Sequence, residues 1–301
     1  MIDVHQHLWP DSLREVLNKR AAPPRIRRDG VLLLDGELPA PVDPADHDPV
    51  RRARLDGAER ILVALSHPLG LEALPADEAH EALAAWHDGA FALGDPFGVW
   101  GTVALTDAAP ADVDAILDRG AVGLSLPAGA LAGPEGYDRL GPVLERLAAR
   151  EAPLFVHPGA AAVPPGPRPA WWSALTDYVA QMQVAWFAFL EWGRPAHPAL
   201  RVVFAMCAGG APLQLERLAA RGGPAAAAHD TGIFYDTSSY GVRTLDALIR
   251  VVGVDQLVYG SDRPVAEPPP TGMLGPAAHH VISTTNVLRL LQATPAEAGI
   301  R

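Results

Sequence analysis

Short apolar runs, each bounded by Gly, Pro or Asp, recur along the whole chain. Runs of this length and composition predict buried strands, and longer Ala- and Leu-rich stretches between them predict helices. The expected strands lie at residues 2–5, 61–65, 98–105, 121–126, 153–157, 202–206, 233–237 and 256–260. The expected helices lie at 50–59, 76–92, 111–119, 137–150, 171–192, 212–221, 242–252 and 277–291. Strand and helix therefore alternate eight times.

The strands are apolar almost throughout, rather than alternating with polar residues. This pattern is typical of a parallel sheet that helices cover on both faces. The predicted fold class is α/β, a (β/α)₈ TIM barrel that forms a single domain over residues 1–301. An open doubly wound sheet is the alternative, but the first strand is not followed by a Gly-x-Gly-x-x-Gly turn. Two Asp-Gly pairs predict a small inserted hairpin at about 24–41.

Composition and charge exclude several classes of protein. The 24 Lys and Arg residues against 35 Asp and Glu give a formal net charge of -11, which argues against a nucleic-acid partner. No apolar run approaches the roughly 18 residues of a membrane span, so no membrane partner is expected. Cys207 is the only cysteine. A reducing, cytoplasmic location is the simplest expectation.

Side chains suited to binding a metal stand where the expected strands end. His5 and His7 project to the same side of the first strand, because side chains alternate along a strand. His157 ends the fifth strand, and Asp262 follows the eighth. In a closed barrel the carboxyl ends of the strands meet, so these four side chains would converge. Their nitrogen and oxygen atoms suit one divalent ion, Zn²⁺ first and Mn²⁺ as the alternative.

The motifs around these residues resemble the amidohydrolase superfamily, and specifically the amidohydrolase-related branch that includes aminocarboxymuconate semialdehyde decarboxylase. The segments that carry the resemblance are residues 2–7 (IDVHQH), 155–159 (FVHPG), 208–212 (AGGAP), 216–218 (ERL) and 259–264 (YGSDRP). The resemblance implies a (β/α)₈ barrel with one catalytic divalent ion, and either hydrolysis of C–N or C–O bonds or non-oxidative decarboxylation. It also implies that His5, His7 and His157 are ligands, and that Asp262 is a ligand or the group that takes a proton from metal-bound water.

Two departures from the family pattern affect this prediction. The sixth-strand His of the branch, a ligand or proton donor, is replaced here by Met206, which cannot carry a proton. Met206 would then only face the substrate, and Cys207 beside it is expected to turn away from the ion. Members with two metals bridge them with a carbamylated Lys on the fourth strand, but residues 121–127 contain no Lys. A single-ion site is therefore expected.

Other candidates for catalysis or substrate binding follow further strands. His67, after the second strand, is the best replacement proton carrier, although a loop His near Pro68 also fits a turn. Ser238 or Tyr240, after the seventh strand, would reach substrate unless the hydroxyls cap the next helix. Arg263 would hold a substrate carboxylate unless it pairs with an acid at the rim.

The segment 171–192 is rich in aromatic residues. Positions 171, 175, 178, 182, 186 and 189 form one helical stripe, which predicts packing against the barrel. Trp172, Phe187 and Trp192 lie off this stripe and predict a subunit interface or a pocket wall, and a homodimer is expected. A Pro- and Ala-rich segment at 160–169 predicts a loop over the mouth of the barrel.

The preferred function is metal-dependent hydrolysis of a small amide, lactone or ester by metal-activated water. Non-oxidative decarboxylation of a small unsaturated carboxylic acid is the first alternative. It requires an acid near the substrate carbon, which the loss of the sixth-strand His weakens. A catalytically degenerate barrel that only binds a metal or a ligand is the second alternative, and Met206 motivates it.

Overall fold

All eight predicted strands are present in the computed structural model, which describes residues 1–55, 57–163 and 166–292. They form one parallel sheet in chain order. The strands are β1 (Ile2–Gln6), β5 (Arg60–Val63), β6 (Phe97–Gly101), β7 (Gly123–Pro127), β8 (Leu154–His157), β9 (Val202–Phe204), β10 (Ile233–Asp236) and β11 (Leu257–Val258).

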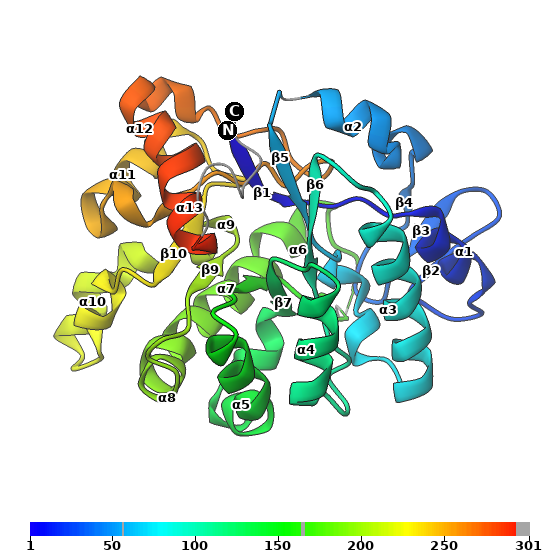
Figure 1. The fold of residues 1–301 in the computed structure, drawn as a ribbon, viewed down its shortest axis with the longest axis horizontal. Helices are drawn as coiled ribbons and strands as arrows, with labels where there is room; N and C mark the ends of the chain where they lie inside the picture. The colour runs from blue at the N-terminus through cyan, green and yellow to red at the C-terminus, as the bar shows by residue number, and fades with distance from the viewer. Residues whose placement is uncertain (56, 164–165, 293–301) are drawn as a thin grey trace.

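The sheet closes on itself, as expected for a TIM barrel. The Val4 amide donates to the Tyr259 carbonyl at 2.9 Å, and the Asp262 amide donates to the His5 carbonyl at 2.8 Å. These bonds join β1 to the segment that follows β11. In Figure 1 the blue strand β1 lies beside the orange segment, with the helices arranged around the strands. The predicted fold class is confirmed.

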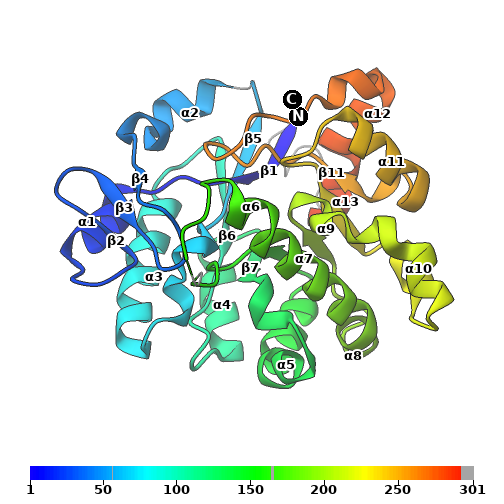
Figure 2. The same cartoon turned by 180° about the vertical axis from the view of Figure 1, so that it is seen from behind.

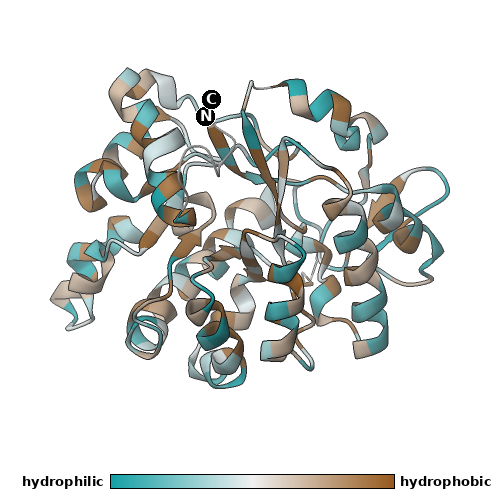
Figure 3. Cartoon of the chain, viewed as in Figure 1, coloured by the Kyte–Doolittle hydropathy of each residue, from teal (hydrophilic) through white to brown (hydrophobic). Residues whose placement is uncertain are grey.

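Helices surround the strands, and most of them bury residues against the barrel. The main helices are α1 (Asp11–Lys19), α2 (Pro49–Leu55), α3 (Ala76–Phe91), α4 (Pro110–Asp118), α5 (Pro134–Ala149), α6 (Trp172–Leu175), α7 (Asp177–Ala188), α10 (Leu215–Ala220), α11 (Val242–Val252), α12 (Pro276–His280) and α13 (Asn286–Leu291). In α11 the buried side chains Leu245, Leu248 and Val252 recur at steps of three and four. Burial of each stabilises the fold by about 1.5–3 kcal/mol. In Figure 3 the strands are largely brown (hydrophobic), whereas the outer helices carry both hydrophobic and hydrophilic residues.

The insertion after β1 is larger than a hairpin. It forms a separate antiparallel sheet of three short strands, β2 (Arg25–Ile26), β3 (Val31–Leu33) and β4 (Ala40–Pro41). Figures 1 and 2 place this small sheet beside α1, a helix that the apolar pattern did not predict. Only Leu13 and Leu17 of α1 are buried, so its apolar signal is weak.

Several predicted strands end earlier in the structure than expected. The run at 98–105 ends as a strand at Gly101, and the run at 202–206 ends at Phe204. The second run stops because Met206, Cys207 and Ala208 adopt positive φ angles of 51°, 50° and 54°, which a strand excludes. Residue 56 of the expected helix at 50–59 and residues 164 and 165 of the expected loop at 160–169 lie outside the described residues.

The aromatic segment 171–192 is not one helix with a single buried stripe. It divides into α6 and α7 and continues as a π-helical turn at Phe189–Gly193. Met182, Trp186 and Phe189 are buried as expected, but Trp171 is 56% exposed and Leu175 is 61% exposed. The prediction is wrong for these two residues because the helix is interrupted between α6 and α7, so the stripe is not continuous. Trp192, off the stripe, is 43% exposed; the homodimer stays a prediction.

No described helix combines the length and the apolar character that crossing a bilayer requires.

Candidate metal centre and active site

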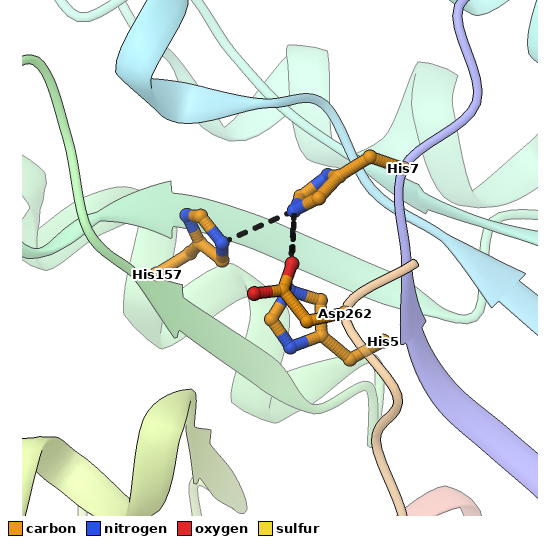
Figure 4. A group of neighbouring side chains, drawn as sticks. All are labelled: His5, His7, His157 and Asp262. Carbon is orange, nitrogen blue, oxygen red and sulfur yellow. Dashed lines mark hydrogen bonds and ion pairs between the residues drawn. The ribbon is translucent and has the colours of Figure 1, made fainter. Parts of the chain in front are cut away.

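Four side chains from three separate parts of the chain converge at the carboxyl ends of the strands (Figure 4). His5 lies in β1 and His7 directly after it, His157 ends β8, and Asp262 follows β11. Nε2 of His7 lies 3.2 Å from Nε2 of both His5 and His157. Oδ1 of Asp262 lies 3.3 Å from Nε2 of His5 and of His7. One ligand atom from each residue lies within 4.8 Å of all the others.

The hydrogen bonds of the Nδ1 atoms determine which nitrogen of each ring faces the cluster. Nδ1 of His7 donates to the Ala64 carbonyl at 3.0 Å, and Nδ1 of His157 donates to the Pro158 carbonyl at 2.8 Å. A carbonyl can only accept, so in neutral rings the Nε2 atoms carry lone pairs. Two such lone pairs at 3.2 Å repel each other, and a cation between them would remove that repulsion.

The carboxylate at the cluster gives a second indication of a cation site. Oδ1 of Asp262 is buried and has no hydrogen-bond partner among the described residues. Leaving a buried acceptor unsatisfied costs about 1–3 kcal/mol, and more for a charged one. Three imidazole nitrogens and one carboxylate oxygen are a donor set that suits Zn²⁺ or a similar divalent ion. The residues present therefore fit the divalent ion that the sequence predicts.

Burial and neighbouring charges set the protonation of the cluster. Burial lowers the pKa of His7 and holds the pKa of His157 well below its ordinary value, which favours the neutral imidazoles that ligands require. Burial also disfavours the charged form of His5, but Asp236 and Asp262 outweigh it and raise the pKa of His5 to about 9. Burial raises the pKa of Asp262, but the positive charge of His5 and the contact with His7 bring it below its ordinary value. A proton and a metal ion would therefore compete for His5.

Asp236, at the end of β10, holds His5 in place. Its Oδ2 lies 2.6 Å from Nδ1 of His5. Its Oδ1 accepts three bonds, from the Met206 amide at 3.0 Å, the Ser238 amide at 2.8 Å and the Ser238 hydroxyl at 2.6 Å. A carboxylate that orients an imidazole ligand is a recurring partner in metal sites. Sequence reasoning missed this role, although an acidic residue at a strand end was a usable signal.

Arg52, on α2, holds the main chain on both sides of the cluster. Its guanidinium donates to the His7 carbonyl at 2.9 Å and to the Arg263 carbonyl at 3.0 Å, and it also contacts the Gln6 side-chain oxygen. The side chain is 2% exposed. A planar guanidinium suits this bridging role because its donors are fixed in one plane. The sequence predicted a helix at 50–59 but assigned no role to Arg52, because the carbonyls that it contacts lie in other parts of the chain.

Close packing between β1, β10 and the end of β11 depends on Gly260. A Cβ atom at this position would lie 2.8 Å from Cβ of His5 and 3.0 Å from Cγ of Asp236. Asp3 reinforces the same junction, because its Oδ1 accepts from the His5 amide at 3.1 Å and from the Ser261 amide at 3.0 Å. The ligands His5 and Asp262 are thus held by neighbouring main chain as well as by their own strands.

A cavity of about 420 Å³ opens onto the cluster, and His7, His157 and Asp262 form part of its wall. Most other wall residues are apolar: Trp9, Leu32, Leu34, Leu38, Pro68, Leu69, Leu175, Val179, Met206 and Val265. The further polar wall residues are Glu37, Ser66, Tyr178, Ser239 and Tyr240. Among the residues that the structure describes, no Lys or Arg lines this cavity.

The structure brings some of the predicted substrate-binding residues to this cavity and not others. Met206 and Tyr240 line it. Ser238 is fully buried, and its hydroxyl is bonded to Asp236 instead. The Arg263 side chain is not part of the wall, while its carbonyl accepts from the His7 amide at 2.7 Å. Substrate contacts by Ser238 and Arg263 stay predictions that this placement does not support.

His67 and Cys207 are not among the described wall residues of the cavity. Nε2 of His67 lies 3.0 Å from the Ser125 hydroxyl, and its Nδ1 lies 3.1 Å from Oε1 of Glu72. Both ring nitrogens thus face other protein groups, and the ring is fully buried. This placement does not favour His67 as a proton carrier. The Cys207 thiol donates to the Asp236 carbonyl at 3.1 Å.

Comparison with solved structures finds the same fold over nearly the whole chain. The apo IDCase of Metarhizium anisopliae is 19% identical with a TM-score of 0.79, covering 97% of this chain and 96% of that chain. A 2,6-dihydroxybenzoate decarboxylase from Rhizobium is 18% identical with a TM-score of 0.68, covering 97% and 98%. A 5-carboxyvanillate decarboxylase from Novosphingobium aromaticivorans, complexed with manganese and 4-hydroxy-3-methoxy-5-nitrobenzoic acid, is 16% identical with a TM-score of 0.68, covering 97% and 95%.

A comparison with curated proteins finds no match to this sequence. The family model described as amidohydrolase matches residues 2–296, a range that includes all four converging side chains. The family that the motifs resemble is therefore confirmed, and the chain belongs to the amidohydrolase family.

Proposed function

We propose that this protein is a metal-dependent decarboxylase that removes CO₂ from a small, largely apolar carboxylic acid. The observation that carries the proposal is the cavity, which opens directly onto the ligand cluster and has no Lys or Arg among its described wall residues. A substrate carboxylate would therefore find its cationic partner only at the ion. The two named decarboxylases with this fold support the same reaction class.

His5, His7, His157 and Asp262 would hold the ion. When bound, the ion would supply positive charge that anchors the carboxylate and stabilises the negative charge left on the substrate. The apolar walls exclude water from the substrate body. Such an environment favours decarboxylation, because the concentrated charge of a carboxylate is dispersed as CO₂ leaves.

Asp262 is the group that we assign to proton transfer. In decarboxylation the C–C bond to the carboxylate breaks, the electron pair stays on the substrate carbon, and that carbon takes up one proton. Asp262 lines the cavity and is 6% exposed, so its carboxylate would take a proton from water and pass it to that carbon. This assignment answers the objection raised by Met206, because no sixth-strand imidazole is then needed.

Hydrolysis, the function preferred from sequence, needs more proton transfers than decarboxylation. One proton must leave the attacking water and another must reach the leaving group. Apart from the imidazole ligands and Asp262, the titratable wall residues are Glu37, Tyr178 and Tyr240. Hydrolysis would need one of these residues, or Asp262 acting twice, to carry the second proton, whereas decarboxylation needs only Asp262. The decarboxylase alternative fits this site better than the hydrolase for this reason.

A parallel assay of both reactions tests the proposal. Protein loaded with Mn²⁺ or Zn²⁺ is incubated with hydroxy- and amino-substituted aromatic acids and, separately, with esters, lactones and amides. We expect CO₂ release from at least one acid, with deuterium incorporated at the vacated carbon in D₂O. Asp262→Asn should abolish both signals, whereas Asp246→Asn, at an exposed ion pair with Arg250, should not. Hydrolysis without CO₂ release from any acid would overturn the proposal.

A further inference from the structure

Glu37 and Tyr178 meet at the wall of the cavity from distant parts of the chain. Glu37 follows β3 in the inserted sheet, and Tyr178 lies near the start of α7. The Tyr178 hydroxyl donates a hydrogen bond to Oε1 of Glu37. Both residues line the same cavity as His7, His157 and Asp262. The insertion therefore contributes a carboxylate to a wall that is otherwise mainly apolar.

The turn before Glu37 is pressed against the loop that follows β8. Gly36 has a φ angle of +82°, and a Cβ atom there would lie 2.6 Å from the Ala161 carbonyl oxygen and 2.8 Å from that of Ala162. Only glycine adopts this conformation readily and also permits such close contact. The position of Glu37 is thus set by main-chain packing, and does not depend on its own side chain alone.

The charge of Glu37 has no cationic partner among the described residues. Among those residues, Tyr178 is the one that donates a hydrogen bond to the Glu37 carboxylate. Burial and the nearby Glu37 raise the pKa of Tyr178, so the phenol keeps its proton and serves as a donor. A half-buried carboxylate with one neutral donor in a mainly apolar wall still has acceptor capacity to offer. A ligand group that donates hydrogen bonds would fill this capacity, and a second carboxylate would be repelled.

We propose that Glu37, supported by Tyr178, selects substrates that carry a hydrogen-bond donor at the end remote from the reacting carboxylate. The donor is an ammonium group or a hydroxyl group, and the substrate is a monocarboxylic acid with an apolar body between the two ends. This inference rests on the proposed function, because it assumes that the carboxylate occupies the metal end of the cavity.

Binding measurements on the metal-loaded protein test this inference without relying on turnover. The probes are benzoate, 4-hydroxybenzoate, three acids of increasing reach (4-aminobenzoate, 4-(aminomethyl)benzoate and 4-(2-aminoethyl)benzoate) and terephthalate. We expect one donor-bearing acid to bind about tenfold more tightly than benzoate, the size of one hydrogen bond to a charged group. Terephthalate should bind more weakly than benzoate. The acid that binds most tightly indicates the distance that the substrate must span between the ion and Glu37. It also shows whether the preferred donor is charged.

Glu37→Gln should remove the advantage of a charged donor and relieve the penalty on terephthalate, while benzoate binding stays unchanged. Tyr178→Phe should weaken selectivity less, because the carboxylate remains. Asp35→Asn, an exposed carboxylate in the same turn, is the matched control and should retain the wild-type order. Equal affinities for all probes in the wild type, or an equal loss for every probe in Glu37→Gln, would overturn the inference. Selectivity for donors without CO₂ release would instead count only against the proposed function.

Discussion

Nδ1 of His5 lies 2.6 Å from Oδ2 of Asp236, and both side chains are fully buried. The pair ties the first strand of the barrel to β10. Because Nδ1 faces Asp236, Nε2 of the same ring faces His7 and Asp262. The orientation of this candidate ligand therefore depends on a residue outside the ligand set.

Replacing Asp236 with Asn should weaken metal binding about 10–100-fold, the usual cost of losing a carboxylate that orients a ligand. Both oxygens of Asp236 accept hydrogen bonds, so an amide must turn its NH₂ group toward at least one donor. Competition with a chelator of known affinity measures the change. Asp246→Asn should bind metal like the wild type, and an Asp236→Asn variant with unchanged affinity would contradict the assignment.

Replacing Arg52 with Met should lower both stability and metal affinity. The change leaves the buried His7 carbonyl without this donor, at a cost of about 1–3 kcal/mol, whereas the Arg263 carbonyl still accepts from the His7 amide. Urea unfolding with and without a chelator separates the two effects. Arg52→Lys keeps the charge but not the planar fork, so it should recover only part of the loss. Full recovery by Lys would show that charge alone is needed.

Replacing Gly260 with Ala should destabilise the fold by about 1–3 kcal/mol, because the added methyl group overpacks the junction beside His5 and Asp236. Thermal or urea unfolding measures this loss. Gly272→Ala is the matched control, since a Cβ atom there meets nothing within 4 Å. Equal stability of the two variants would mean that the junction relaxes without cost.

His87 should make the protein less stable as the pH falls. Burial first, and then the charge of Arg119, lower its pKa from 6.5 to about 4 in the folded state. The unfolded chain takes up a proton near pH 6.5, whereas the folded protein resists it until about pH 4. Stability is therefore lost as the pH falls through this window, by about 2 kcal/mol between pH 7 and pH 5.

Urea unfolding at pH 7 and pH 5 measures this effect by comparing wild type with His87→Gln. Glutamine keeps an acceptor for the Thr102 amide, which donates to Nε2 of His87 at 3.2 Å. The variant should lose less stability than the wild type over this range. An identical loss in both proteins would assign the pH dependence to other groups.

The sequence predicted the barrel and the ligand cluster well because both depend on local patterns. Short apolar runs between Gly and Pro identify strands, and the carboxyl ends of barrel strands meet at one face. His5 and His7 were assigned to one side because side chains alternate along a strand. These rules need no knowledge of how loops pack.

The features that the sequence did not predict depend on tertiary contacts, which leave no local pattern in the sequence. His67 stands at the correct end of its strand, but Glu72 and Ser125 engage its two nitrogens. Trp171 and Leu175 continue a helical stripe in sequence, yet the break after α6 leaves them exposed. The approach of Glu37 to Tyr178 joins positions 141 residues apart, and only the packed insertion brings them together.

The place of the cluster at the seam between β1 and the segment after β11 has a consequence for folding. Closing a ring between distant parts of a chain costs conformational entropy, and anything that binds only the closed form offsets that cost. An ion shared by His5, His7 and Asp262 would join the first barrel strand to the segment that follows the last. The same cation would thus stabilise barrel closure, so that loss of the ion would weaken the fold as well as remove the activity.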